Sequence, residues 1–254
     1  MSKLPTEHKF VDFSDYGRPI ARIIANTLKD TTFTAIHVTI GFIISGIIAA
    51  YCIIQGHFWL AAFFLILKSI LDAADGELAR IKKQPSYTGR YLDSVSDIIL
   101  NAIFFISIWY ITETSVWICL MAFLGLQLQG TLYNYYYVIL RIKLNGDKTS
   151  RIIEDSVPKA LNGEKQSHVN ILFFSYQLLY GPFDKSIYYL DRNAQDGKSL
   201  PNWLMTSIST FGLGFQLLLI SIMLILGLKS IILPFFLGYS FMIFVFIGIR
   251  KYII

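Results

Sequence analysis

Charged residues are scarce in this chain. Asp, Glu, Lys and Arg make up 15% of the 254 residues, whereas soluble domains carry about a quarter. Four stretches have no charged residue, namely 31–67, 98–112, 114–140 and 199–228. Three of them exceed the roughly 20 residues that a helix needs to cross the hydrocarbon of a bilayer. The composition excludes a soluble domain and predicts an all-α, polytopic membrane protein.

Cysteine and histidine are also rare. The two cysteines, Cys52 and Cys119, both lie in apolar segments, which favours packing over a disulfide or a metal pair. The four histidines are scattered without the spacing of metal ligands, which argues against a zinc site.

The hydropathy pattern predicts six transmembrane helices joined on one side by very short turns. Residues 1–34 form a separate arm, in which Arg18–Lys29 alternates basic and apolar residues as an interfacial helix does. The membrane domain covers 35–254 and includes a long loop at about 141–202, whose apolar piece Ile171–Tyr180 is too short to span and is interfacial or re-entrant. The six predicted spans are Ala35–Ile54, Phe58–Ala79, Tyr91–Thr112, Ser115–Leu140, Trp203–Gly227 and Ile231–Ile249.

Basic residues predict which side of the membrane the loops occupy. With both termini on the same side, 20 of the 22 Lys and Arg residues fall on that side; Lys229 falls on the other, and Lys68 lies within a span. The positive-inside rule then places both termini and the long loop in the cytoplasm. We expect the partner of this basic face to be the lipid bilayer and not a nucleic acid.

Carboxylates occur where membrane helices normally avoid them. At 100° per residue, Asp72, Asp75, Gly76 and Ala79 share one face of the second span, and Glu77 lies off that face. Ionised side chains cost roughly 2.5–3.5 kcal/mol each at the centre of a span, so a group of them implies a ligand or a task. A matching stripe on the third span consists of Gly89, Asp93 and Asp97.

The two acidic faces can meet, because the linker between the spans contains Pro85 and turns the chain back. Two like charges about 4 Å apart repel by roughly 4 kcal/mol at an effective dielectric of 20, so the cluster needs cations or protons. Oxygen-only ligands point to Mg²⁺, Mn²⁺ or Ca²⁺. Lys68, one turn before Asp72, is placed to neutralise it.

A cation-coupled transporter and a structural membrane protein are the non-enzyme alternatives.

The pattern resembles a known signature. Asp72-x-x-Asp75-Gly76-x-x-Ala79-Arg80, eight residues, Gly89, three residues, Asp93, three residues and Asp97 is similar at every fixed position to the motif of the CDP-alcohol phosphotransferase family. Eight specified residues give a chance match on the order of 10⁻¹⁰ per starting position. The six-helix layout is also similar to the membrane domain of that family.

The resemblance implies a reaction and a set of roles. Members transfer a substituted phosphate from a CDP-linked donor to an alcohol, release CMP and are commonly homodimers. By resemblance, Mg²⁺ or Mn²⁺ binds the aspartates Asp72, Asp75, Asp93 and Asp97, and Asp97 is also the general base. The CDP-binding residues are then Asp72, Gly76, Ala79, Arg80 and Gly89.

The substrates stay open at this stage. CDP-diacylglycerol with a small polar alcohol, in phospholipid biosynthesis, is the leading hypothesis; CDP-choline or CDP-ethanolamine with diacylglycerol, or CDP-inositol with a phosphorylated polyol, are alternatives. Arg141, Lys143 and Arg151 follow the fourth span on the predicted cytoplasmic side. They are candidates for binding an acceptor phosphate, and the alternative is that they are ordinary positive-inside residues.

Overall fold

The protein is all-helical, as the sequence predicts. The computed structural model describes residues 10–144, 151–197 and 200–253, which form helices and loops without a strand. Four helices are long: α2 (Ala35–Ile54), α3 (Phe58–Ile81), α4 (Tyr87–Thr112) and α5 (Val116–Lys143). The others are α1 (Arg18–Leu28), α6 (Gln166–Leu179), α7 (Gly181–Leu190), α8 (Asn202–Ile208), α9 (Leu213–Ile225), α10 (Lys229–Tyr239) and α11 (Met242–Ile253), with 3₁₀ turns η2 (Phe13–Asp15), η3 (Arg192–Ala194) and η4 (Ser209–Phe211).

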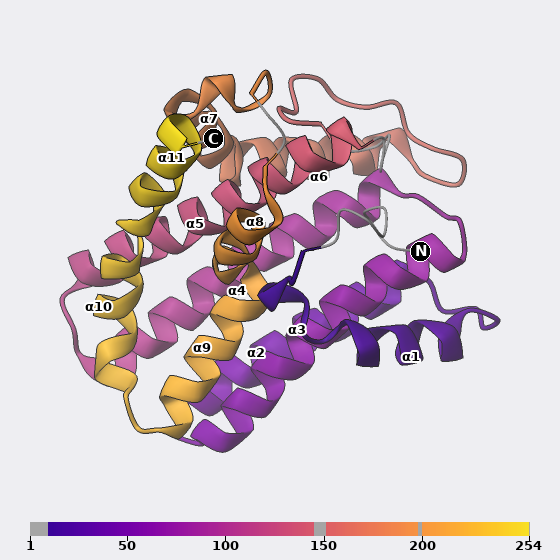
Figure 1. Cartoon of the computed structure of the whole chain (residues 1–254). Coiled ribbons are helices and arrows are strands. Elements are labelled where there is room, and N and C mark those ends of the chain that lie inside the picture. The colour runs from indigo at the N-terminus through magenta and orange to yellow at the C-terminus, as the bar shows by residue number, and fades with distance from the viewer. Residues whose placement is uncertain (1–9, 145–150, 198–199, 254) are drawn as a thin grey trace.

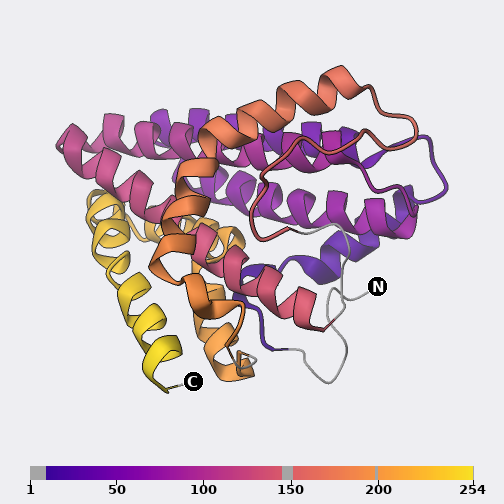
Figure 2. The same ribbon diagram turned by 90° about the horizontal axis from the view of Figure 1, so that it is seen from above.

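The long helices lie side by side as a bundle (Figures 1 and 2). The turns that join α4 to α5 and α9 to α10 lie at one end, and the α3–α4 connection lies at the opposite end near α1. Apolar side chains from the bundle helices form one core, in which each of the following is 2% exposed or less: Phe42, Leu65, Phe104, Leu126 and Leu217. The core fixes how α3 meets α4, and so positions their polar ends.

Four helices are long and apolar enough to cross a membrane: Ala35–Ile54, Tyr87–Thr112, Val116–Lys143 and Lys229–Tyr252, the last being α10 and α11 together. A fifth candidate is the pair Asn202–Phe211 and Leu213–Ile225, which is bent by 53°. The 24-residue helix α3 is long enough, but Lys68, Asp72 and Asp75 lie within it. The structure therefore supports four or five spans among the described residues and does not clearly show the six that the sequence predicts.

The break between η4 and α9 lies where the N-terminal segment packs against it. Gly212 is extended there, with φ −69° and ψ 147°. A Cβ atom on Gly212 would lie 2.3 Å from Cβ of Ser14, and one on Gly214 would lie 2.0 Å from the backbone oxygen of Ser14. The backbone N–H of Phe13 also donates to Oγ of Ser209 at 2.9 Å. The N-terminal segment thus occupies the space beside the break, where only glycine fits.

Two shorter helices cover the polar end of the bundle. Helix α1 buries Ala21 and Ala25 completely against α2 and α3, and it leaves Ile20 and Ile23 more than half exposed. Helix α6 packs against Tyr91 of α4 through Val169, Phe173 and Tyr176. The predicted helix Arg18–Lys29 is thus present, and the predicted piece Ile171–Tyr180 belongs to a longer helix.

Candidate active site

Three carboxylates meet at the polar ends of α3 and α4. Asp72, Asp75 and Asp93 each offer an oxygen atom, and these three atoms lie within 4.8 Å of one another. The i, i+3 spacing places the first two on one face of α3. The chain then reverses through residues 82–86, and Ser86 caps α4 by accepting from the Gly89 N–H at 2.8 Å. The reversal brings the Asp93 face of α4 against them.

Asp97 lies one turn beyond Asp93 and is held by a lysine. Nζ of Lys68 contacts Oδ1 of Asp97 and lies 3.3 Å from Oδ2 of Asp72. The Lys68 side chain is fully buried, with its ammonium 4.6 Å from the centre of the Phe42 ring. The sequence paired this lysine with Asp72 alone; in the structure it bridges both helices and offsets part of their negative charge.

The remaining ligand atoms suit a hard cation. Oδ2 of Asp75 accepts from Oγ1 of Thr39 at 2.7 Å, which fixes the carboxylate. Oδ1 of Asp93 is buried, and within the described part of the chain it has no hydrogen-bond partner. An unsatisfied buried carboxylate oxygen is costly unless a cation or a donor from a ligand binds it. Three carboxylates with such an oxygen fit Mg²⁺ or Mn²⁺.

A cavity of about 370 Å³ opens over this cluster. All four aspartates line it, together with Gly76 and Arg80. A Cβ atom on Gly76 would lie 3.4 Å from Nη1 of Arg80, so the glycine leaves room beside this guanidinium. Ala79 and Gly89, which the resemblance assigns to CDP binding, line neither this cavity nor its neighbour. The N–H of Gly89 instead binds the helix cap.

A second cavity of about 290 Å³ adjoins the first and is rich in guanidinium groups. Arg80, Asp93 and Arg141 line both cavities, and Arg151 lines the second. Lys143 lines neither, and its ammonium donates to the backbone oxygen of Gly197. Of the three basic residues proposed for the acceptor, the structure brings two to a cavity and turns the third away.

The sequence analysis missed three cavity residues in α6, in α7 and between them: Tyr176, Tyr180 and Asp184. Burial raises the pKa of the Tyr180 hydroxyl, and the charges of Asp97 and Asp93 raise it further. Burial also raises the pKa of Asp184 to about 6, although a hydrogen bond from Tyr176 lowers it. No motif marks these residues, because their packing against α4 depends on the fold.

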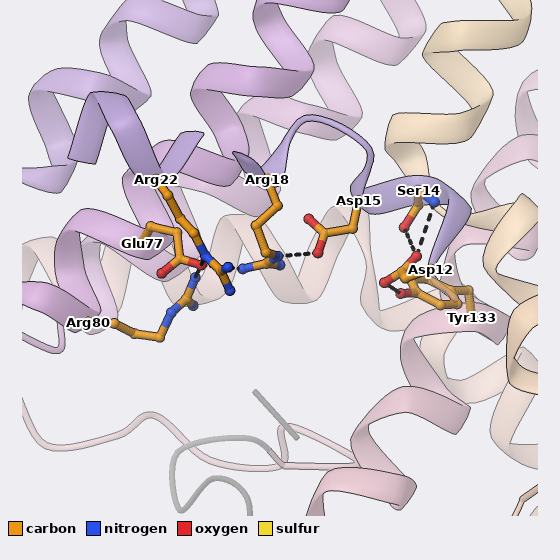
Figure 3. A network of polar contacts seen from close by, with 8 residues as sticks. All are labelled: Asp12, Ser14, Asp15, Arg18, Arg22, Glu77, Arg80 and Tyr133. Atoms are coloured by element: carbon orange, nitrogen blue, oxygen red, sulfur yellow. Dashed lines mark hydrogen bonds and ion pairs between the residues drawn. The ribbon is translucent and has the colours of Figure 1, made fainter. Parts of the chain in front are cut away.

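A buried ion-pair network joins α1 to the same end of α3 (Figure 3). Glu77 is 1% exposed, and its Oε1 lies near the guanidinium groups of Arg18, Arg22 and Arg80 at 2.6, 3.6 and 3.4 Å. Arg18 also binds Asp15, and both residues line the first cavity. Glu77 points away from the aspartate cluster, as its helical phase predicts, but it is an anchor of the N-terminal helix.

Comparison with known proteins gives one family. The sequence model of the CDP-alcohol phosphatidyltransferase family matches residues 24–152, which is 129 of the 254 residues. The match contains every residue of the aspartate cluster, and α6 to α11 lie beyond it. No curated protein matches the chain.

Proposed function

The chain belongs to the CDP-alcohol phosphatidyltransferase family, and from this premise we propose that it transfers a substituted phosphate from CDP-diacylglycerol to the hydroxyl of a small polar alcohol and releases CMP. The observation that carries the proposal is the meeting of Asp72, Asp75 and Asp93 within 4.8 Å, in a cavity that Asp97 and Arg80 also line. We place the reaction at the cytoplasmic face of the bilayer, in a homodimer with six transmembrane helices in each protomer. Residues 1–34 form the cytoplasmic arm, and residues 35–254 form the membrane domain.

Asp72, Asp75 and Asp93 would hold Mg²⁺ or Mn²⁺, with Asp97 beside them. When bound, such a cation neutralises the charge of the donor pyrophosphate and of the departing CMP. The guanidinium of Arg80 offers two parallel donors, which suits a phosphate of the donor. Gly76 has no side chain beside this guanidinium, which leaves the guanidinium more open to a phosphate.

Asp97 is placed to accept the proton of the acceptor hydroxyl. Oxygen of the acceptor attacks the β-phosphorus, a new O–P bond forms, and the bond between that phosphorus and the oxygen of CMP breaks. The hydroxyl proton passes to the Asp97 carboxylate. The ammonium of Lys68 contacts this carboxylate and fixes its position.

Arg141 and Arg151 support an anionic acceptor. Arg141 lines both cavities and Arg151 lines the second, and Asp93 and Arg80 are also shared between the two cavities. We assign the acceptor phosphate or carboxylate to these two arginines, and Lys143 has no part in this site.

The test is CMP release by the purified full chain in detergent or nanodiscs. The protein is incubated with Mg²⁺ or Mn²⁺, with CDP-diacylglycerol, CDP-choline, CDP-ethanolamine or CDP-inositol, and with alcohol acceptors that include diacylglycerol. We expect CMP only with CDP-diacylglycerol and a polar acceptor, and a loss of about 10²–10⁴-fold in Asp97→Asn. A folded protein that releases no CMP with any pair would overturn the transferase proposal, and preference for another donor would overturn the substrate assignment.

A further inference from the structure

Helices α6 and α7 contribute side chains to both cavities. Tyr176 and Asp184 line both cavities, and Tyr180 lines the first. These helices lie beyond residues 24–152, the range that the family model matches. They therefore form a part of the site that the shared motif does not determine.

Asp184 is held in one orientation by aromatic packing. Its Oδ2 accepts from the hydroxyl of Tyr176 at 2.7 Å. The Tyr176 ring packs on Tyr91 of α4, with ring centres 5.4 Å apart, and stacks on Tyr180 with centres 5.3 Å apart and planes 13° from parallel. Tyr176 is only 9% exposed, so the stack is rigid and Asp184 is presented as a fixed acceptor of hydrogen bonds.

The position of Asp184 matches the path of the acceptor. In the proposed reaction the attacking hydroxyl lies at Asp97, in the first cavity, and the anionic group lies at Arg141, which lines both cavities. Asp184 lines both cavities as well. A carboxylate in this place attracts hydroxyl and ammonium groups and repels phosphate. An acceptor held at Asp97 and Arg141 therefore shares its cavities with this carboxylate.

We propose that Asp184, oriented by Tyr176, selects the acceptor by binding a second hydrogen-bond donor, a hydroxyl or an ammonium group, next to the attacking hydroxyl. This inference rests on the proposed transferase function. It predicts that acceptors with such a group are used in preference to acceptors without it. An analogue that lacks the group leaves the buried carboxylate without a hydrogen-bond donor, and this lowers the use of that analogue.

The test compares two pairs of acceptors with CDP-diacylglycerol and Mg²⁺. One pair is glycerol 3-phosphate and 3-hydroxypropyl phosphate, which lacks the second hydroxyl; the other is serine and 3-hydroxypropanoate, which lacks the ammonium. In each pair, the full acceptor is the compound that carries the second hydroxyl or the ammonium. For the pair that wild type uses, we expect the KM of the full acceptor to rise by about 10- to 100-fold in Asp184→Asn. The KM for the donor stays within twofold, and the full acceptor loses its advantage over its analogue.

Two further variants separate recognition from folding. Tyr176→Phe keeps the aromatic stack and removes the hydroxyl, so it should raise the acceptor KM by a smaller factor. Asp155→Asn changes an exposed aspartate that lines neither cavity and should leave both KM values unchanged. An unchanged acceptor KM in Asp184→Asn, or equal use of both members of a pair by wild type, overturns the inference and leaves the transferase function standing. CMP release with none of the four acceptors overturns both the inference and the acceptor class on which it rests.

Discussion

Nη1 of Arg18, in the first turn of α1, lies 2.6 Å from Oε1 of Glu77 in α3. The same carboxylate oxygen lies 3.4 Å from Nη2 of Arg80, which lines both cavities. A single buried side chain therefore joins the N-terminal helix to an arginine of the candidate active site (Figure 3). Three guanidinium groups lie around this one acid, so its loss removes the negative charge that they share, although Arg18 keeps its contact with Asp15.

Glu77→Gln should therefore destabilise the protein. Removing one member of a buried ion pair costs roughly 3–5 kcal/mol; because Arg18 and Arg22 are 18% and 51% exposed, we expect about 2–3 kcal/mol. The position of Glu77 off the acidic face of the helix, which the sequence predicts, gives no sign of this loss of stability. The measurement is the melting temperature in detergent, with the exposed Glu113→Gln as the control. Equal melting temperatures for the two variants would refute the anchoring role.

Lys68→Met should make the stability of the protein depend more strongly on divalent cations. Lys68 is the ammonium that bridges Asp72 and Asp97, and without it their carboxylates repel each other at full strength. We expect a loss of about 3 kcal/mol in EDTA. Addition of Mg²⁺ should raise the melting temperature of this variant more than that of wild type, because the cation replaces the missing charge. The same Mg²⁺ shift in both proteins would contradict this account.

Asp93→Asn should remove the response to metal while stabilising the metal-free protein. The substitution deletes one of three converging charges and one ligand. For wild type, Mn²⁺ at a hundred times its Kd should add about 2.7 kcal/mol of stability. Melting curves with EDTA and with Mn²⁺ give both quantities. Asp30→Asn, at an 85% exposed side chain outside the cluster, is the matched control and should keep the full Mn²⁺ shift. A full shift in Asp93→Asn would exclude Asp93 as a ligand.

The aspartate cluster could be predicted from the sequence because it depends on local geometry. The i, i+3 spacing of Asp72 and Asp75 sets their common face, and a short turn brings back Asp93. Lys68 could be placed one helical turn from Asp72 for the same reason. Its contact with Asp97, 29 residues further along, depends on how α3 packs against α4.

The remaining parts of the site depend on contacts between distant segments. Glu77 meets Arg18 across 59 positions, and its charge alone gives no sign of this contact. Asp184 reaches the cavity because α6 packs on Tyr91 of α4, and no periodicity in the sequence predicts that docking. The fifth predicted span is broken because Ser14 packs against Gly214, a contact across 200 positions. Hydropathy describes each segment alone and so predicts a continuous helix there.

The raised pKa of Asp184 predicts that stability falls as the pH rises. Burial raises this pKa to about 6, so the folded protein binds a proton that the unfolded chain, with an ordinary pKa near 4, has released. Between these two values the folded state binds more protons than the unfolded state, and its free energy of unfolding decreases with increasing pH by up to about 3 kcal/mol in total. The decrease from this residue continues through pH 6 and is nearly complete about one pH unit above it.

Asp184→Asn isolates this contribution, because the amide has the shape of the protonated acid and cannot ionise. We expect the variant to match wild type near pH 4 and to be the more stable protein at pH 7, while it loses selectivity for the acceptor. Unfolding in detergent at several values between pH 4 and 7, with Asp155→Asn as the exposed control, measures the difference. A variant that is less stable than wild type at pH 7 would mean that the ionised carboxylate stabilises the fold. A gain in stability together with a higher acceptor KM would mean that the buried charge is kept for binding at the expense of folding.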